Sequence, residues 1–223
     1  AVRNEFPDTS TRWLAFGSSQ GGQAAWAANE LADAYGSGLE LVGTVSVVPA
    51  ADMSGLAALA SDGTLSPGQV QAMPLIVSGL RVVHPDLVVG DYLSGAAATD
   101  VEALTSCTAP AAARKQQVAG QLSADDVRPA SPAATAQLET WLRDEALPQR
   151  ATSAPMMVLY GGRDELIDAD WTSAALDRAC DLGGRIVRRE QPDRGHTDIE
   201  IGDEMYGWMN DRFAGRDAPS DCV

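Results

Sequence analysis

The sequence has few histidines and cysteines and no long apolar run. It contains two histidines, His84 and His196, and three cysteines, Cys107, Cys180 and Cys222. None of the cysteines has the Cys-x-x-Cys spacing typical of zinc ligands, so we expect no metal site and no metal cofactor. No stretch approaches the roughly 20 apolar residues that a membrane-spanning helix needs. We therefore expect a soluble protein with no transmembrane segment.

Basic residues are scarce as well. The 223 residues include 16 Lys and Arg against 31 Asp and Glu, which gives a formal net charge of −15. Such a charge repels phosphate backbones and anionic lipid headgroups, so nucleic acid is a poor candidate as a partner. Hydrophobic residues make up 45% of the chain, enough to bury a core in one large domain or two small ones.

The three cysteines leave two interpretations open. In an oxidising compartment, Cys180 and Cys222 could tie the last helix to the one before it, and Cys107 would then need a partner elsewhere. In a cytosolic protein all three would be free thiols. Residues 1–5 have neither the basic leader nor the apolar stretch of a signal peptide, as expected of a mature chain or of one cleaved at an internal position.

The first fifty residues follow a strand, turn, helix, strand pattern. A short apolar run over residues 12–16 ends in a turn over residues 17–22, and an Ala-rich stretch over residues 23–35 predicts a helix closed by Gly36. Residues 39–48 are nearly all apolar or β-branched, which is typical of a strand covered on both faces in a parallel sheet.

Between residues 52 and 150 the pattern changes to helical stretches separated by Gly, Pro and Ser, with no further buried strand. We interpret this segment as an inserted helical cap, or lid. Its candidate helices cover residues 53–61, 66–83, 111–122 and 132–147.

The sheet pattern resumes after the cap, with strands over residues 155–160 and 185–190 and helices over residues 171–182 and 201–213. Strands that alternate with helices predict a doubly wound, mostly parallel α/β sheet. We therefore expect residues 1–51 and 151–223 to form one α/β-hydrolase sheet domain, which the cap over residues 52–150 interrupts.

A serine lies in the sharp turn between the first strand and the first helix. Gly17-Ser18-Ser19-Gln20-Gly21 matches Gly-x-Ser-x-Gly centred on Ser19, the turn that exposes a nucleophilic serine above a sheet. Small residues at Gly17 and Gly21 allow the strand and helix to approach. The backbone N–H of Gln20 is the expected oxyanion donor. Ser18 lacks flanking glycines.

A serine nucleophile needs a base and an acid that orients it. His196 follows the strand over residues 185–190, at the edge of the sheet where catalytic loops gather, whereas His84 lies in the cap and is expected to make packing or surface contacts. Asp164 follows the strand over residues 155–160; its neighbours Glu165, Asp168 and Asp170 are competitors, expected to be solvated or to cap the next helix. The order Ser19, Asp164, His196 is that of α/β-hydrolases.

Several motifs together resemble the secretory lipase family of the α/β-hydrolase superfamily. They are the Gln-Gly-Gly after Ser19, the large helical insertion, Gly-Gly-Arg-Asp-Glu-Leu-Ile, Gly-His, and the ending Arg-Phe-Ala-Gly-x-x-Ala-Pro-Ser-x-Cys. The resemblance covers the chain from about Trp13 onward, outside the variable cap. It implies secretion, a lid over an acyl-binding tunnel, no cofactor, hydrolysis of lipid or simple acyl esters, and a disulfide between Cys180 and Cys222.

Two rival functions remain. The same triad serves peptidases, acyltransferases and polyester hydrolases, and a hydrolase-like fold also occurs in non-catalytic binding proteins. Within the cap, the apolar stretches 75–77 and 87–89 either line an acyl pocket or pack against the cap's own helices.

The chain departs from the resembled family at its start. In that family the nucleophile lies near the middle, after the first half of the sheet and a loop that supplies one oxyanion donor, whereas Ser19 almost opens this chain. We therefore expect the N-terminal half of the sheet to be missing from this chain, and a companion polypeptide to complete the sheet and the oxyanion hole.

Overall fold

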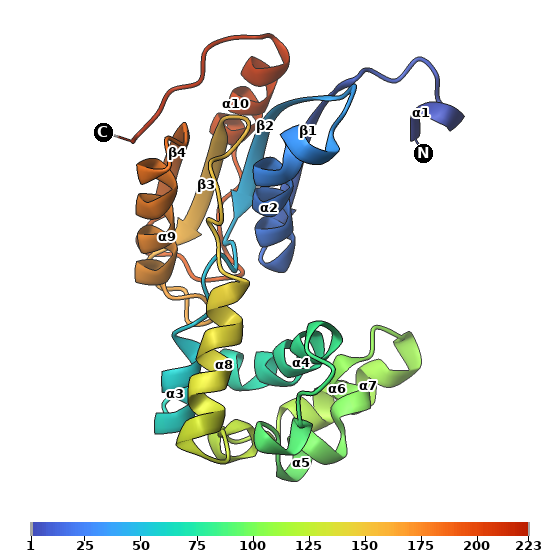
Figure 1. Cartoon of the computed structure of the whole chain (residues 1–223), viewed down its shortest axis with the longest axis vertical. Helices are drawn as coiled ribbons and strands as arrows, with labels where there is room; N and C mark the ends of the chain where they lie inside the picture. The colour runs from blue at the N-terminus through green and yellow to red at the C-terminus, as the bar shows by residue number, and fades with distance from the viewer. Residues whose placement is uncertain (1, 223) are drawn as a thin grey trace. The chain divides into compact units, whose positions relative to one another are not determined.

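Figure 1 shows the computed structural model of the chain, which describes residues 2–222. The chain divides into a sheet unit, formed by the residues up to Asp52 and from Ala146 onward, and a helical unit, Met53–Glu145. Each unit is described by itself. The sheet unit resumes at Ala146. There the Leu147 N–H donates to the carbonyl oxygen of Ala51 at 2.7 Å, which ties the returning chain to the end of the first part of the unit.

A buried carboxylate holds the same segment. Glu30 accepts hydrogen bonds from the backbone N–H groups of Gln149 and Arg150 at 3.0 and 3.2 Å. Burial removes water from this carboxyl group and raises the pKa of Glu30, although the two N–H donors oppose that shift.

The sheet unit contains four parallel strands in the order β1 (Arg12–Ser18), β2 (Glu40–Val47), β3 (Met156–Gly161) and β4 (Ile186–Gln191). Between them run the helices α2 (Gln20–Tyr35) and α9 (Ala169–Asp181), and α10 (Asp203–Phe213) follows β4. A short helix, α1 (Val2–Glu5), precedes the sheet. The strands predicted from apolar runs lie within about two residues of those observed.

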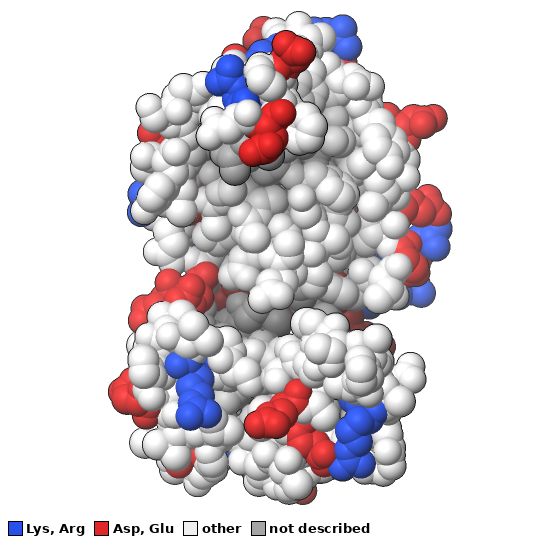
Figure 2. All heavy atoms as spheres, turned by 90° about the vertical axis from the view of Figure 1, so that its right-hand side faces the viewer, with Lys and Arg blue, Asp and Glu red and all other residues white. Residues whose placement is uncertain are grey.

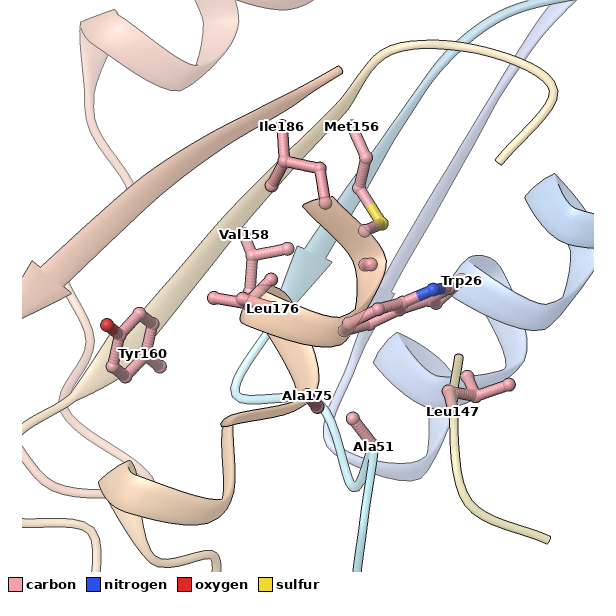
Figure 3. Close-up of a cluster of buried hydrophobic side chains, with 10 residues drawn as sticks. Trp26, Ala51, Leu147, Met156, Val158, Tyr160, Ala175, Leu176 and Ile186 are labelled. Atoms are coloured by element: carbon pink, nitrogen blue, oxygen red, sulfur yellow. The ribbon is translucent and has the colours of Figure 1, made fainter. Parts of the chain in front are cut away.

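Alternate residues of β3 pack on opposite faces of the sheet, as the period of a strand requires. Met156 and Val158 belong to one cluster with Trp26 of α2 and Leu176 of α9, which Figure 3 shows from close by. The helices α2 and α9 therefore cover this face.

The intervening residues of β3, Met157 and Leu159, pack with Trp208 of α10 on the other face. A Cβ atom on Gly43 of β2 would lie 2.9 Å from the Trp208 ring, so glycine at this position lets α10 approach the sheet. Helices on both faces confirm the predicted doubly wound α/β fold.

Strand β1 lies at one edge of the sheet and pairs with β2 alone among the described strands. Its Phe16 side chain is half exposed, at 50%. Figure 2 shows a broad surface without Lys, Arg, Asp or Glu on this side of the sheet unit, over α2 and β1. Such an uncharged surface beside an open strand edge stands out in a chain whose net charge is −15.

The helical unit contains no strand within its described residues, as expected. Its α4 begins with a capping box in which Ser66 and Gln69 bond to each other's backbone. The sequence did not predict α5 and α6, because helices of five residues have too few turns to show a period. The helices and 3₁₀ turns are α3 (Leu56–Asp62), α4 (Pro67–Val83), η1 (Val89–Asp91), α5 (Gly95–Thr99), α6 (Val101–Thr105), α7 (Ala109–Ala119), η2 (Ala124–Val127) and α8 (Pro132–Asp144).

In the helical unit, His84 and part of the two predicted apolar stretches, residues 75–77 and 87–89, make ordinary packing contacts. His84 ends α4 and stacks on Trp141, with 4.8 Å between the ring centroids. Of the two apolar stretches, Val77 and Leu87 are buried, whereas Leu75 and Val88 are exposed. Within residues 2–222 no helix has the length and apolar character needed to cross a membrane.

A disulfide joins Cys180, near the end of α9, to Cys222, 42 residues further along the chain, and Cys107 is free and exposed. The pairing implied by the family resemblance is therefore present. Because the bond closes a long loop in the unfolded chain, replacing both cysteines with alanine is expected to lower the free energy of unfolding by about 4 kcal/mol. Denaturant unfolding measures this loss, with Cys107→Ala as the control. Equal unfolding midpoints for the double variant and the control would contradict it.

Candidate active site

Ser19 occupies the junction between β1 and α2 in a backbone conformation that non-glycine residues seldom adopt. Its φ is 58° and its ψ is −122°. Backbone hydrogen bonds hold this conformation: Ser19 N–H donates to the carbonyl oxygen of Val47 at 2.8 Å, and Ser19 C=O accepts from Ala50 N–H at 3.3 Å. Such strain persists where the surroundings enforce it, most often at functional sites.

The glycines around Ser19 have unequal steric roles. A Cβ atom on Gly17 would lie 1.9 Å from the carbonyl oxygen of Gly21, and one on Gly22 would lie 2.9 Å from that of Val47. A Cβ atom on Gly21 would meet nothing within 4 Å in the described chain. The small residues that the turn requires here are thus Gly17 and Gly22, since Gly22 rather than Gly21 packs against β2.

This difference predicts opposite outcomes for two matched substitutions. We expect Gly17→Ala to distort the Ser19 turn and to destabilise the protein by several kcal/mol, about the range of severe steric changes. We expect Gly21→Ala to be tolerated. Thermal unfolding of both variants checks this, and a Gly21→Ala variant as damaged as Gly17→Ala would show that the steric argument is wrong.

The three residues predicted from the motifs meet at the carboxyl edge of the sheet. His196 Nε2 lies 2.9 Å from Ser19 Oγ, and His196 Nδ1 lies 2.8 Å from Asp164 Oδ2. The Asp164 side chain is 1% exposed and that of His196 is 17% exposed. A continuous hydrogen-bonded chain thus joins residues that follow β1, β3 and β4.

The second oxygen of Asp164 fixes the carboxylate in place. Asp164 Oδ1 accepts hydrogen bonds from the backbone N–H groups of Leu166 and Ile167, both at 2.9 Å. The competitor Asp168 instead caps α9, because its side chain accepts from Asp170 N–H at 2.8 Å. Asp164 is the carboxylate that bonds to the imidazole.

The loop that carries Asp164 and the loop that carries His196 are joined by backbone hydrogen bonds. Gly162 N–H donates to Gln191 C=O at 3.0 Å, and Arg163 N–H donates to Arg194 C=O at 2.8 Å. A Cβ atom on Gly161 would lie 2.3 Å from the Arg194 carbonyl oxygen. Sequence reasoning did not identify this role of Gly161, although the Gly-Gly pair after a buried strand is a signal of close backbone approach.

Gln20 is the first residue of α2, directly after Ser19. The first N–H groups of a helix have no acceptor within the helix, and they point toward a site that suits developing negative charge. This is the position expected of an oxyanion donor. Among the described residues, no group of three His, Cys, Asp or Glu side chains could hold a metal ion.

Two solved structures are similar to this chain over nearly all its length. Candida antarctica lipase A in its closed state has a TM-score of 0.74 and 17% identity, with 100% of this chain and 54% of that chain covered. The rice cell wall degrading esterase LipA from Xanthomonas oryzae, in a ligand-bound form, has a TM-score of 0.65 and 17% identity, with 88% and 54% covered. The chain thus spans about half the length of the solved structures it matches.

No curated protein sequence matches the chain. The family model for secretory lipases matches residues 6–221. This range includes the turn that contains Ser19, the helical unit, the loops of Asp164 and His196, and nearly all of the C-terminal segment. It agrees with the family resemblance seen in the sequence motifs. The chain belongs to the secretory lipase family.

Proposed function

We propose that this chain carries the catalytic residues of a secreted serine ester hydrolase, a lipase or carboxylesterase. The observation that carries the proposal is the hydrogen-bonded chain from Ser19 Oγ through the His196 ring to Asp164. Ser19 is the proposed nucleophile, His196 the general base and Asp164 the acid that orients the imidazole.

In the proposed reaction His196 Nε2 takes the proton of Ser19 as Oγ attacks the ester carbonyl. Asp164 holds the ring with its proton on Nδ1 and stabilises the imidazolium that forms. His196 then gives the proton to the leaving alcohol, which yields an acyl-Ser19 ester. Water, deprotonated by the same imidazole, hydrolyses this ester and releases the acid. The backbone N–H of Gln20 would stabilise the oxyanion in both steps.

One donor alone makes a weak oxyanion hole, since removing a donor typically costs about 10²–10³ in rate. We propose that polypeptide outside these 223 residues supplies the second donor and pairs with the open edge of β1. The half-exposed Phe16 and the uncharged surface over β1 and α2 support this (Figure 2). The intact mass of every polypeptide in a purified, active preparation tests it. A preparation that contains only this chain, and that hydrolyses esters without the loss of about 10²–10³ in rate expected for a missing donor, would refute it.

The family and the structural relatives favour acyl esters as substrates. Among those relatives, one is described as a lipase and another as an esterase that degrades rice cell walls. We propose that the helical unit, which interrupts the sheet unit in the sequence, is the inserted cap, or lid, that the sequence predicts. The family's description also supports secretion.

Reaction with a fluorophosphonate probe tests the proposed function. The probe phosphonylates serines that a base activates, so we expect one label per chain, mapped by mass spectrometry to the peptide that contains Ser19. A panel of acyl esters, peptides and polyesters then separates an esterase from a peptidase or a polyester hydrolase. Failure of a folded preparation to take the label would instead favour a binding protein.

A further inference from the structure

The loop that carries His196 has no fully buried residue, and only Ile199, near its end, packs against a buried cluster of the sheet unit. None of residues 192–200 is buried, and the segment contains neither helix nor strand. An exposed loop of this kind is ordinarily mobile. Yet the imidazole must stay within hydrogen-bond reach of Ser19. Besides the backbone bond from Arg163 N–H to Arg194 C=O, bonds at the ends of the loop therefore have to help fix its path.

Gln191, the last residue of β4, bonds to both ends of this loop. Its side-chain Nε2 donates to the Glu200 carbonyl oxygen and its Oε1 accepts from Glu200 N–H, both at 2.9 Å. Its backbone carbonyl oxygen accepts from Gly162 and Arg194 N–H groups, both at 3.0 Å. The reciprocal pair with Glu200 defines the orientation of the amide, because the opposite orientation would face donor with donor and acceptor with acceptor.

From this geometry we propose that Gln191 is a positioning residue for the general base, an inference that rests on the proposed function. The Gln191 side chain ties the end of the loop back to its start, as one extra rung of a sheet would do. The loop from Pro192 to Ile199 is thereby closed, and the ring of His196 is kept between Asp164 and Ser19.

The amide chemistry explains why glutamine suits this position. A single planar group must accept from an N–H and donate to a C=O of the same residue, which a carboxylate cannot do. The other side-chain contacts of the loop are weaker anchors. The ion pairs of Asp193 with Arg163 and of Glu200 with Arg194 are exposed, and exposed pairs typically contribute little. Asp198 accepts from Gly195 N–H at 2.6 Å, but this bond lies within the loop and does not close it.

Two variants of Gln191 test the proposal in the natural protein that contains this chain. Gln191→Leu removes both side-chain bonds, and Gln191→Glu keeps the size but loses the donor. For each we expect kcat for ester hydrolysis to fall roughly tenfold to 100-fold, with KM within about twofold, because small displacements of a catalytic group reduce rate more than binding. The matched control is Asp193→Ala in the same loop, for which we expect kcat within about twofold.

Proton NMR supplies a readout that does not depend on activity. The ring N–H of a histidine bonded to a buried carboxylate gives a far-downfield signal that is slow to exchange with water. A signal that persists in a His84→Gln variant and disappears in a His196→Gln variant is that of His196. We expect this signal to broaden or disappear in both Gln191 variants and to persist in Asp193→Ala, while thermal unfolding midpoints stay unchanged.

Wild-type kcat together with an unchanged His196 signal in both Gln191 variants would overturn the proposal. A loss of kcat with an intact His196 signal would also overturn it, since the effect would then not pass through the imidazole. If the unmodified protein neither hydrolyses esters nor takes the fluorophosphonate label, the proposed function fails. The NMR comparison still decides in that case whether Gln191 holds the ring.

Discussion

Replacing Ser19 with alanine is expected to lower the rate of ester hydrolysis by about 10⁴- to 10⁶-fold. The reason is chemical rather than structural: Oγ is the atom that forms the acyl bond, and alanine removes it without adding volume. Alanine keeps a Cβ atom, so the unusual φ of 58° at this position and the hydrogen bonds of its backbone persist. Steady-state kinetics with a chromogenic ester, together with fluorophosphonate labelling, measures the effect.

The neighbouring serine provides the control. Ser18 is exposed at the end of β1, and no contact joins its hydroxyl to His196, whose Nε2 lies beside Ser19 Oγ. Ser18→Ala should retain hydrolysis and labelling. Retention of most activity by Ser19→Ala, or loss of labelling only in Ser18→Ala, would assign the nucleophile elsewhere and end the proposed mechanism.

Replacing Asp164 with asparagine is expected to lower kcat by about 10⁴-fold, as such a change does in serine proteases. Asparagine would present an NH₂ or a neutral oxygen to His196 Nδ1 in place of a carboxylate. When the NH₂ faces Nδ1, the ring carries its proton on Nε2, which then donates to Ser19 Oγ and cannot accept the hydroxyl proton. The backbone N–H donors of Leu166 and Ile167, which bond to Oδ1, favour this orientation because they need an oxygen.

Asp168→Asn is the matched control for this change. Asp168 caps α9 through Asp170 N–H, and asparagine caps helices about as well as aspartate. We therefore expect Asp168→Asn to leave both kcat and stability nearly unchanged. If Asp168→Asn were the variant that lost activity, the carboxylate would have been assigned to the wrong residue.

The local sequence patterns predicted the order of the strands and the longer helices well. The apolar runs of β1, β2, β3 and β4 and the helix that ends at Gly36 depend on side-chain periods over a few residues, which a sequence displays directly. The five-residue helices α5 and α6 have no such period. Their positions depend on packing within the helical unit, so they could not be predicted.

For the candidate site, the sequence alone predicted Ser19 as nucleophile, His196 as base and Asp164 as acid. Only the tertiary structure decided that the three side chains meet, because the backbone hydrogen bonds between the two loops bring His196 to Asp164 and leave Asp168, its predicted competitor, as a helix cap. The structure also showed that Gly22, and not the predicted Gly21, makes the close contact with the backbone of β2. Distances between residues far apart in the chain depend on how strands and loops pack, and no local pattern encodes them.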